Sequence, residues 1–296
     1  MKAIITGVTG YLGAFLAKEL IQNEISIVAI TRASNKQLLL NSNYKEVLLA
    51  DFNDYKVLDS VICLERPDFI IHAAAISRVD VCEDNSGIAM DFNTHFSIAF
   101  ANAAHKQEVF FVYISTDLVF EGYQAAPSSG FSEVDLPKPV HIYASSKHAA
   151  EVELLKLNNV AVVRTSLITG PYNQSGGGSI LENFKNGNKV SLFYDEFRTP
   201  IHVADLSCFL RTLGERKKTG LFHAAGPEKI SRFDLGEALA RAYNYPLSLI
   251  NKASRLSYVS NPPRAPDVAL DNTKAERELN YRFKKIGAAL IEYARF

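Results

Sequence analysis

The chain has 296 residues, of which 47% are apolar and 22% charged, and 32 basic residues balance 32 acidic ones. This composition excludes an intrinsically disordered protein, which needs low hydrophobicity and high net charge. A formal net charge of +0 gives no general attraction toward nucleic acid or an anionic membrane, so we expect neither as a partner. The three cysteines are odd in number and form no CxxC pair, which excludes a disulfide framework.

The N-terminal segment MKAIITG passes from a short apolar run into glycine and lacks the layout of a signal peptide. No apolar stretch approaches the ~20 residues that a helix needs to cross a bilayer. We therefore expect a cytoplasmic protein that binds a small-molecule substrate and spans no membrane.

Short runs rich in β-branched residues alternate with helical patterns in the first half of the chain. The strand-like runs cover residues 2–6, 25–30, 46–50, 69–73, 109–114 and 160–164. Between the first two, the apolar residues 12, 15, 16 and 20 fall on one face of a helix. Strands that alternate with helices and are apolar on both faces predict a parallel sheet covered on both sides. The pattern predicts an α/β protein with a Rossmann-type, doubly wound parallel sheet.

The first chemical signal is the run GVTGYLG at residues 7–13, which follows the first strand and opens the first helix. Gly7, Gly10 and Gly13 permit a tight turn and a close approach of the backbone to a diphosphate. The helix N-terminus adds free N–H groups and the positive end of its dipole. In this strand–turn–helix context the run predicts a nucleotide-binding site.

The pattern changes after about residue 165, where GP at 170–171 and SGGGS at 175–179 are loop signals. Single strand-like pieces at 190–194 and 221–225 and a helical stretch at 232–242 follow, before the proline-rich NPPRAP at 261–266. We expect a dinucleotide-binding core over residues 1–166, to which 200–225 returns. Residues 167–296 are expected to form mainly a smaller C-terminal substrate-binding cap.

The spacing GxxGxxG, with YASSK at residues 143–147 far downstream, resembles the extended branch of the short-chain dehydrogenase/reductase superfamily. Asp51 after the third strand and IHAAA at 71–75 fit the same branch. The stretches AAAISRVD at 73–80, STDLVFEG at 115–122 and RTS at 164–166 are similar to the dTDP-4-dehydrorhamnose reductase-like subfamily. RAPDVALD at 264–271 is similar but interrupted. The resemblance runs from residue 1 to about 225, and more loosely to the end.

The resemblance implies a cofactor that lies along the glycine turn, the ends of the next strands and one helix. The residues concerned are Gly7, Thr9, Gly10, Tyr11, Leu12, Gly13, Arg32, Asp51, Phe52, Ala73, Ala74, Ala75, Asn93, Tyr143 and Lys147. Arg32 stands where an NAD site usually has an acid, and it can pair with a 2′-phosphate. We therefore expect NADP, with NAD as the alternative. Asn93 is equally compatible with a structural amide.

Tyr143 and Lys147 lie four residues apart and share one face of a predicted helix. A free tyrosine has a pKa of ~10, and a nearby ammonium favours the phenolate and lowers that pKa. Such a phenol can give a proton to a carbonyl oxygen as hydride reaches the carbon. Ser115 and Thr116 are adjacent on a strand and point to opposite faces, so only one can hold the same oxygen. The resemblance assigns Thr116, which completes a catalytic set with Tyr143 and Lys147.

The substrate side rests on the resemblance, which implies a binding role for Ser77, Thr116 and Arg198. Arg198 opens the segment RTPIHVAD at 198–205, which resembles a family segment with an arginine near the ligand. The expected substrate is a nucleoside-diphosphate sugar. Some family members use a glutamate for a magnesium contact where this chain has Phe15, so we expect no metal site.

Three functions fit these residues. The first is an NAD(P)H-dependent reductase of a nucleotide-linked 4-keto sugar, an oxidoreductase. The second is a nucleotide-sugar epimerase that retains its NAD; dehydration is disfavoured, because Leu118 stands where sugar dehydratases carry an acid–base glutamate. The third is a non-catalytic NADP-binding regulatory subunit similar to that of methionine adenosyltransferase. The intact Tyr143, Lys147 and Thr116 favour an enzyme over the third.

Two helix faces also predict a homodimer through the core helices, because the corresponding helices pair in many short-chain reductases and a two-fold interface needs one self-complementary patch. One face is the apolar stripe Phe92, Phe96, Ala99, Phe100 and Ala103. The other lies on the helix that carries Tyr143 and is rich in small residues. The alternative is that both faces bury against the sheet.

Overall fold

The computed structural model describes residues 1–31, 44–48, 55–123, 127–171, 177–258 and 264–293. The chain divides into two compact units, each built from three separate stretches. Unit 1 consists of Met1–Thr116, His141–Val163 and Ser207–Phe222, and unit 2 of Asp117–Val140, Arg164–Leu206 and His223–Phe296. The predicted cofactor residues Arg32, Asp51 and Phe52 lie outside the described residues. None of the helices in the described part combines the length and apolar character that crossing a membrane requires.

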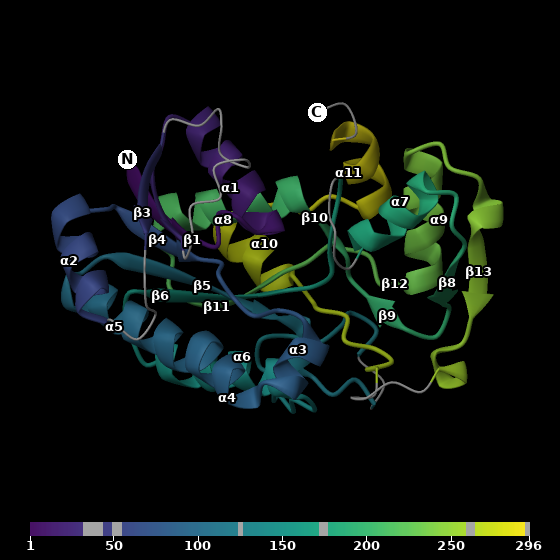
Figure 1. Cartoon of the computed structure of the whole chain (residues 1–296), viewed down its shortest axis with the longest axis horizontal. Coiled ribbons are helices and arrows are strands. Elements are labelled where there is room, and N and C mark those ends of the chain that lie inside the picture. Colours follow the sequence, from purple (N-terminus) through teal and green to yellow (C-terminus); the bar gives the residue numbers. More distant parts are fainter. Residues whose placement is uncertain (32–43, 49–54, 124–126, 172–176, 259–263, 294–296) are drawn as a thin grey trace. The chain divides into compact units, whose positions relative to one another are not determined.

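A seven-stranded sheet runs in the order β11-β6-β5-β4-β1-β2-β3 (Figure 1). Its strands are β1 (Lys2–Thr6), β2 (Ser26–Thr31), β3 (Tyr44–Leu48), β4 (Phe69–His72), β5 (Phe110–Thr116), β6 (Val160–Thr165) and β11 (Gly220–Ala224). The pairs from β3 through β2, β1 and β4 to β5 are all parallel. Strands β4 and β5 are buried along their whole length, as in a sheet covered on both faces. The predicted Rossmann-type α/β fold is confirmed.

Helices cover both faces of this sheet. The helices of unit 1 are α1 (Tyr11–Gln22), α2 (Tyr55–Glu65), α3 (Val79–Asp84), α4 (Ser86–Met90), α5 (Ser97–Lys106), α6 (Ile142–Leu154) and α8 (Val203–Arg216), whose first turn belongs to unit 2. Figure 1 shows α1 and α8 on one side of the strands and α5 and α6 on the other. A π-helical turn, η1 (Asp91–Phe96), joins α4 to α5.

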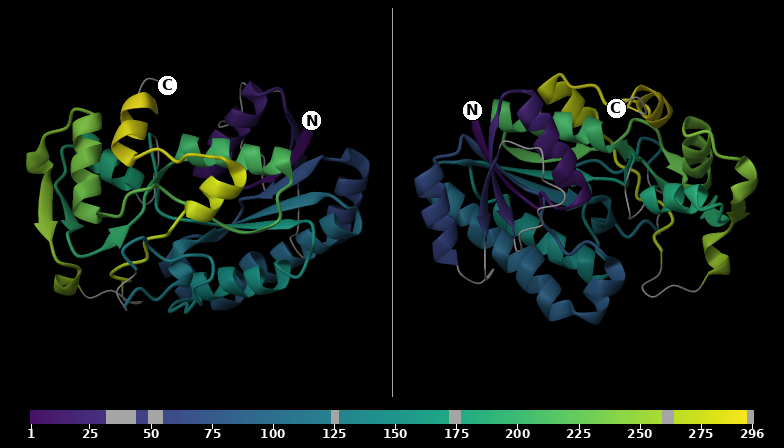
Figure 2. Two further views of the ribbon diagram at one scale, coloured as in Figure 1. Left: turned by 180° about the vertical axis from the view of Figure 1, so that it is seen from behind. Right: turned by 45° about the horizontal axis from the view of Figure 1, so that its top comes forward.

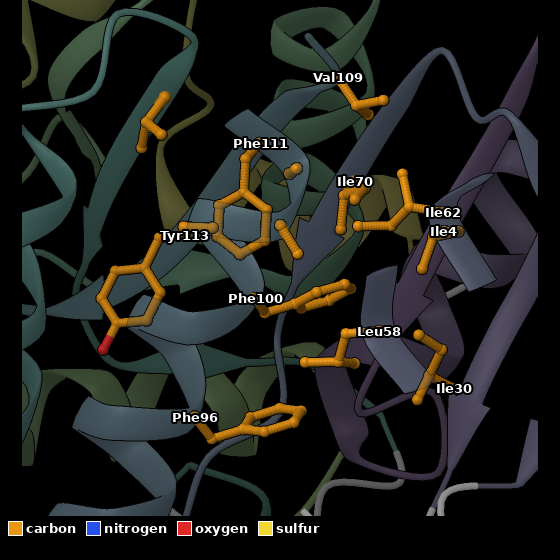
Figure 3. Packing of buried hydrophobic residues seen from close by; sticks show 14 of the residues in the cluster. Ile4, Ile30, Leu58, Ile62, Ile70, Phe96, Phe100, Val109, Phe111 and Tyr113 are labelled. Atoms are coloured by element: carbon orange, nitrogen blue, oxygen red, sulfur yellow. The ribbon is translucent and has the colours of Figure 1, made fainter. Parts of the chain in front are cut away.

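The face of the sheet toward α5 carries a cluster of aromatic and β-branched side chains (Figure 3). Phe92, Phe96 and Phe100 belong to this core, and at most 6% of each is exposed. Phe100 meets Phe111 of β5 edge to face, with ring centroids 5.3 Å apart. The prediction that this stripe forms a dimer face is therefore wrong, because burial against an apolar strand satisfies the stripe inside unit 1. The homodimer itself stays a prediction.

Unit 2 is built from short elements. They are β7 (Ile168–Thr169), α7 (Gly177–Lys185), β8 (Val190–Phe193), β9 (Phe197–Arg198), β10 (Ile201–His202), β12 (Ile230–Ser231), α9 (Arg232–Ala242), β13 (Ile250–Ala253), α10 (Thr273–Leu279) and α11 (Ile286–Tyr293). Strand β13 pairs in parallel with β8, and Figure 2 shows α9 next to them. Leu235 and Leu239 of α9 pack with Leu192 of β8 in a small apolar core. Ser231 and Asp234 start α9 with a capping box.

The carboxyl ends of β1 and β4 lie side by side, since these strands pair in parallel where the strand order reverses. Open parallel sheets bind their ligands at this edge, beside such a switch point. Gly7 follows β1, Ala73 follows β4, and Thr116 ends the neighbouring β5. The fold of unit 1 thus places three of the predicted site segments on one sheet edge.

Candidate active site

The turn after β1 brings backbone atoms closer together than side chains would allow. Gly7 has a φ of +74°, and a Cβ there would lie 2.7 Å from the amide nitrogen of Ala74. A Cβ on Gly13 would lie 2.1 Å from the carbonyl oxygen of Gly7. The amide of Gly10 donates to the same carbonyl at 2.8 Å, and α1 begins without a side-chain cap. The uncapped N-terminus of α1 is therefore suited to an anion such as a diphosphate.

A buried chain of hydrogen bonds ties this turn to the end of β4. The amide of Ala74 donates to Thr6 Oγ1 at 3.2 Å, and this oxygen lies 2.6 Å from His72 Nδ1. His72 Nε2 lies 2.9 Å from Ser97 Oγ, which donates to the carbonyl of Asn93. Because the proton of Ser97 is used there, Nε2 donates to Ser97 and Nδ1 accepts from Thr6. The loop after β4 is thereby fixed against the glycine turn.

Helix α6 carries two of the predicted catalytic side chains, one turn apart. His141 caps the helix, since its Nδ1 accepts from the amide of Ala144 at 3.1 Å. Its ring stacks with that of Tyr143, with centroids 6.2 Å apart. Tyr143 is half-buried, whereas Lys147 is 2% exposed. Helix α6 packs against β5, whose last residue Thr116 is 6% exposed. All three predicted catalytic residues thus belong to unit 1.

Two hydroxyl groups at the end of β5 are candidates for holding the substrate carbonyl oxygen. Ser115 and Thr116 are both buried, and successive strand residues point to opposite faces. Ser115 shares its face with Tyr113, two residues earlier. In the part of the chain that the structure describes, Ser115 Oγ is fully buried and has no hydrogen-bond partner. The assignment of the catalytic hydroxyl to Thr116 stays a prediction.

The ammonium group of Lys147 is buried. Its Nζ is 3.9 Å from the centroid of the Tyr113 ring. Burial lowers the pKa of Lys147 to about 7, against the opposing effect of Glu151. Burial, and then the charge of Lys147, lowers the pKa of His72 to about 3. Near neutral pH His72 is therefore uncharged, while Lys147 is close to the midpoint of its titration. A buried group with such a strongly perturbed pKa is typical of a functional site.

Asn93 lies in the π-helical turn η1 and is fully buried. Its Nδ2 donates to the carbonyl of Ile76 and to Ser146 Oγ, each at 3.0 Å. Its Oδ1 accepts from the amide of Ile76 at 2.8 Å. Both amide protons are thus used inside unit 1, where Asn93 holds the loop after β4 against α6. A direct contact of Asn93 with the cofactor stays a prediction.

The remaining predicted residues of unit 1 follow β1 and β4 directly. Among them Thr9, Gly10 and Ser77 are exposed, and Leu12 is buried. Tyr11 and the run from Ala73 to Ala75 are half-buried. The Tyr11 ring packs edge-on against Phe15, with centroids 5.4 Å apart. These residues line the two loops at the switch point, where a dinucleotide is expected.

Arg198, the substrate residue predicted in unit 2, is part of a buried charge cluster. Its Nε lies 3.6 Å from Asp117 Oδ2, and its NH2 lies 3.5 Å from Glu196 Oε1. Arg264 donates to both oxygens of Glu196, at 2.6 and 3.2 Å, and the amide of Arg232 donates to the Glu196 carbonyl at 2.9 Å. Burial raises the pKa of Glu196, but the three arginines outweigh it and lower the pKa. Among the described residues, Arg198, Arg232 and Arg264 thus all act on the charge of the Glu196 carboxylate.

Sequence reasoning did not single out Tyr113, His141, Glu196 or the hydrogen bonds of His72. His72 and Tyr113 end or interrupt otherwise apolar strands, and a polar group inside such a run is the signal that could have found them. Glu196 lies two residues before Arg198, so its charge was visible. Its two further arginines come from distant parts of the chain, which no local pattern brings together.

The fold and the site define a class. A doubly wound sheet with a glycine turn at its switch point, and a tyrosine and lysine one turn apart on the neighbouring helix, are typical of dinucleotide-binding proteins of the short-chain reductase type. The chain belongs to the RmlD substrate binding domain family, whose model matches residues 1–295. The resemblance found in the sequence is confirmed.

Known proteins match the chain over nearly its whole length. A dTDP-4-dehydrorhamnose reductase of Aggregatibacter actinomycetemcomitans is 28% identical, covering 93% of this chain and 92% of its own. The methionine adenosyltransferase 2 subunit beta of Bos taurus is 29% identical, covering 93% of this chain and 81% of its own. The crystal structure of dTDP-4-dehydrorhamnose reductase from Bacillus anthracis in complex with NADP superposes with a TM-score of 0.84 at 24% identity, over 99% of this chain and 98% of that one.

Proposed function

We propose that this protein is an NAD(P)H-dependent oxidoreductase that reduces the keto group of a nucleotide-linked 4-keto sugar. The observation that carries the proposal is the set of Thr116, Tyr143 and Lys147 in unit 1, whose sheet also holds the glycine turn. The reductase relative at 28% identity supports the substrate class. The matched family supports it as well.

The residues after β1 and β4 fit a dinucleotide cofactor. A Cβ at Gly7 would fill the space against Ala74, and the N-terminus of α1 is uncapped. The backbone of the glycine turn would hold the diphosphate, and Lys147 would hold the ribose next to the nicotinamide. When bound, the nicotinamide supplies the hydride. We propose NADP before NAD because of Arg32, and the NADP-bound structural relative supports this choice.

The side chains of unit 1 supply the proton and hold the reacting oxygen. The phenol of Tyr143 gives its proton to the substrate carbonyl oxygen as that oxygen gains negative charge. The ammonium of Lys147, one turn further along α6, stabilises the charge left on the phenol oxygen. The hydroxyl of Thr116 donates a hydrogen bond to the same carbonyl oxygen and orients it. One proton leaves Tyr143 for each keto group reduced.

Unit 2 supplies a candidate site for the diphosphate of the substrate. The side chains of Arg198 and Arg264 contact the Glu196 carboxylate, and the main-chain amide of Arg232 donates to the Glu196 carbonyl. Burial lowers the pKa of Arg232 to about 10, which still leaves it cationic near neutral pH. Guanidinium groups pair well with phosphate oxygens. We propose that this cluster, with Arg198 as its predicted member, recognises the nucleoside diphosphate.

The test is oxidation of NADPH, followed optically, with a panel of nucleotide-linked 4-keto sugars. Turnover of at least one of them supports the function, and binding of NADPH without turnover of any contradicts it. A nucleotide-sugar epimerase that retains NAD would consume no NADPH and would instead invert a sugar carbon, which product analysis detects. The same assay thus separates the reductase from the epimerase.

Matched variants test the assigned roles. Tyr143→Phe keeps the packed ring but removes the proton, so kcat should fall ~10²–10⁴-fold while NADPH binding is retained. A fall of less than about tenfold would count against Tyr143 as the proton donor. Thr116→Ala should also lower kcat, whereas Ser115→Ala, at the neighbouring position, should have the smaller effect. The reverse order would move the assignment to Ser115.

A second candidate is a non-catalytic NADP-binding subunit. The observation that favours it is the 29% identity to methionine adenosyltransferase 2 subunit beta over 93% of this chain. Such a subunit would bind NADP through the same glycine turn and would bind a companion protein in place of a sugar. Binding of NADPH, no turnover of the sugar panel and complex formation with a methionine adenosyltransferase would together favour this candidate.

A further inference from the structure

Tyr113 is a buried side chain of the candidate site and belongs to none of the sequence motifs described above. It lies on β5, three residues before Thr116, and is fully buried. We propose that Tyr113 is a positioning residue for the reaction, because the face of its ring holds the buried ammonium group of Lys147 and favours its charged form. The proposal rests on the reductase function proposed above, in which a cationic lysine assists Tyr143.

The contact between ring and ammonium is close, and the ring is held at both ends. Lys147 Nζ lies 3.9 Å from the ring centroid, well inside the ~6 Å over which an aromatic face attracts a cation. The Tyr113 hydroxyl donates to the carbonyl of Asn93 at 3.1 Å. The ring stacks on that of His72, with centroids 5.9 Å apart and an angle of 25° between the planes. The tyrosine therefore presents a fixed face to the lysine.

Titratable groups around Tyr113 and Lys147 also affect the charge of the ammonium group. The titratable groups packed around the pair are His72 on β4 and Tyr143, His148 and Glu151 on α6. His72 is uncharged near neutral pH because its pKa is about 3. Burial raises the pKa of Tyr113 well above its ordinary value, so the ring stays a neutral phenol.

Glu151 is the carboxylate that acts on Lys147, and it also lies 3.2 Å from His148 Nδ1. Burial outweighs its effect, since the pKa of Lys147 remains far below the ordinary value. The attraction of a cation to an aromatic face is strongest where water is excluded, and both Lys147 and Tyr113 are at most 2% exposed. Without the ring, the ammonium would lose this stabilisation and release its proton at lower pH.

The test compares Tyr113→Phe, which keeps the ring and loses the hydroxyl, with Tyr113→Leu, which loses both. In protein labelled with ¹³C at the lysine Cε, the Lys147 signal is identified by its absence in Lys147→Met. Tyr113→Leu should lower the pKa of Lys147 by about one unit, and Tyr113→Phe should leave it near the wild-type value. The pH at which kcat changes should follow the Lys147 pKa. It should be lower in Tyr113→Leu and near the wild-type value in Tyr113→Phe.

A second measurement needs no folded leucine variant. The Cε methylene of Lys147 should be shifted upfield by the ring current of residue 113 in the wild type and in Tyr113→Phe. An unshifted signal in the wild type, or equal pKa changes in Tyr113→Phe and Tyr113→Leu, would overturn the proposal. The titration needs no substrate. Failure of the reductase function would therefore show as absent turnover with a normal Lys147 titration, which is a different result.

Discussion

Lys147 should make the protein less stable at low pH than at high pH. In the folded chain burial lowers its pKa to about 7, whereas in the unfolded chain it takes the ordinary value of 10.5. Between these two values the unfolded chain binds more protons, so stability rises with pH across this window. Replacing the lysine by methionine, which has a similar length and no charge, removes the free-energy cost of burying the ammonium group. Lys147→Met should therefore stabilise the fold, and most strongly below pH 7.

The size of the effect follows from the two pKa values. Their difference is 3.5 units, and each unit corresponds to 1.36 kcal/mol. The charged lysine thus costs at most about 5 kcal/mol at pH 6, where it is protonated in both states. At pH 9 the folded chain has released the proton and the cost is about 2 kcal/mol. The advantage of Lys147→Met should shrink by about 3 kcal/mol between these pH values.

Urea unfolding of the two proteins at pH 6 and pH 9 measures this change, because groups that Lys147 does not influence titrate alike in wild type and variant. Lys156→Met is the matched control, since Lys156 is exposed two residues beyond the end of α6. A difference between Lys147→Met and wild type that is equal at both pH values, within about 1 kcal/mol, would refute the reasoning. It would mean that Lys147 is not desolvated in the fold.

Three further predictions concern the cofactor, the charge cluster and assembly. Arg32→Asp should weaken NADP binding and spare NAD, because it replaces a partner of the 2′-phosphate by a like charge; an unchanged NADP/NAD preference in a binding titration would contradict it. Arg198→Ala should lower the free energy of unfolding by about 3 kcal/mol, because it removes a cation from Asp117 and Glu196, and should raise the KM for the nucleotide sugar. Arg198→Lys should recover most of the stability, and an Arg198→Ala protein as stable as the wild type would exclude the structural role. Sedimentation at micromolar concentration should show a dimer, and a species near 32.8 kDa that persists on concentrating would exclude it.

The sequence pattern predicts the bounds of elements that depend only on residues within the same segment. The strand at residues 2–6 and the helix at residues 232–242 have the predicted bounds, because alternation and helical spacing are properties of the segment itself. The first strand of this fold ends at the switch point of the sheet, so the glycine turn that follows this strand lies there as well.

Other features depend on partners that a single segment does not show. The stripe from Phe92 to Ala103 is helical, as its spacing predicts, but its apolar face packs against the sheet. Asn93 lies in a π-helical turn, and its side chain is committed to Ile76 and Ser146, which are distant in the sequence. Arg198 was predicted to face a ligand, whereas its carboxylate neighbours become visible only when the chain is folded.

The division into two units has a consequence for how the protein is made. The chain passes between the units five times, so neither unit corresponds to a continuous stretch of the gene. Unit 1 lacks its last segment until residue 222 of 296 has left the ribosome, by which time much of unit 2 has already emerged. Folding of one unit before the other during synthesis, the usual route for consecutive domains, is therefore closed to this chain. A truncation anywhere before residue 222 should leave both units unfinished, with unpaired strand edges exposed to aggregation.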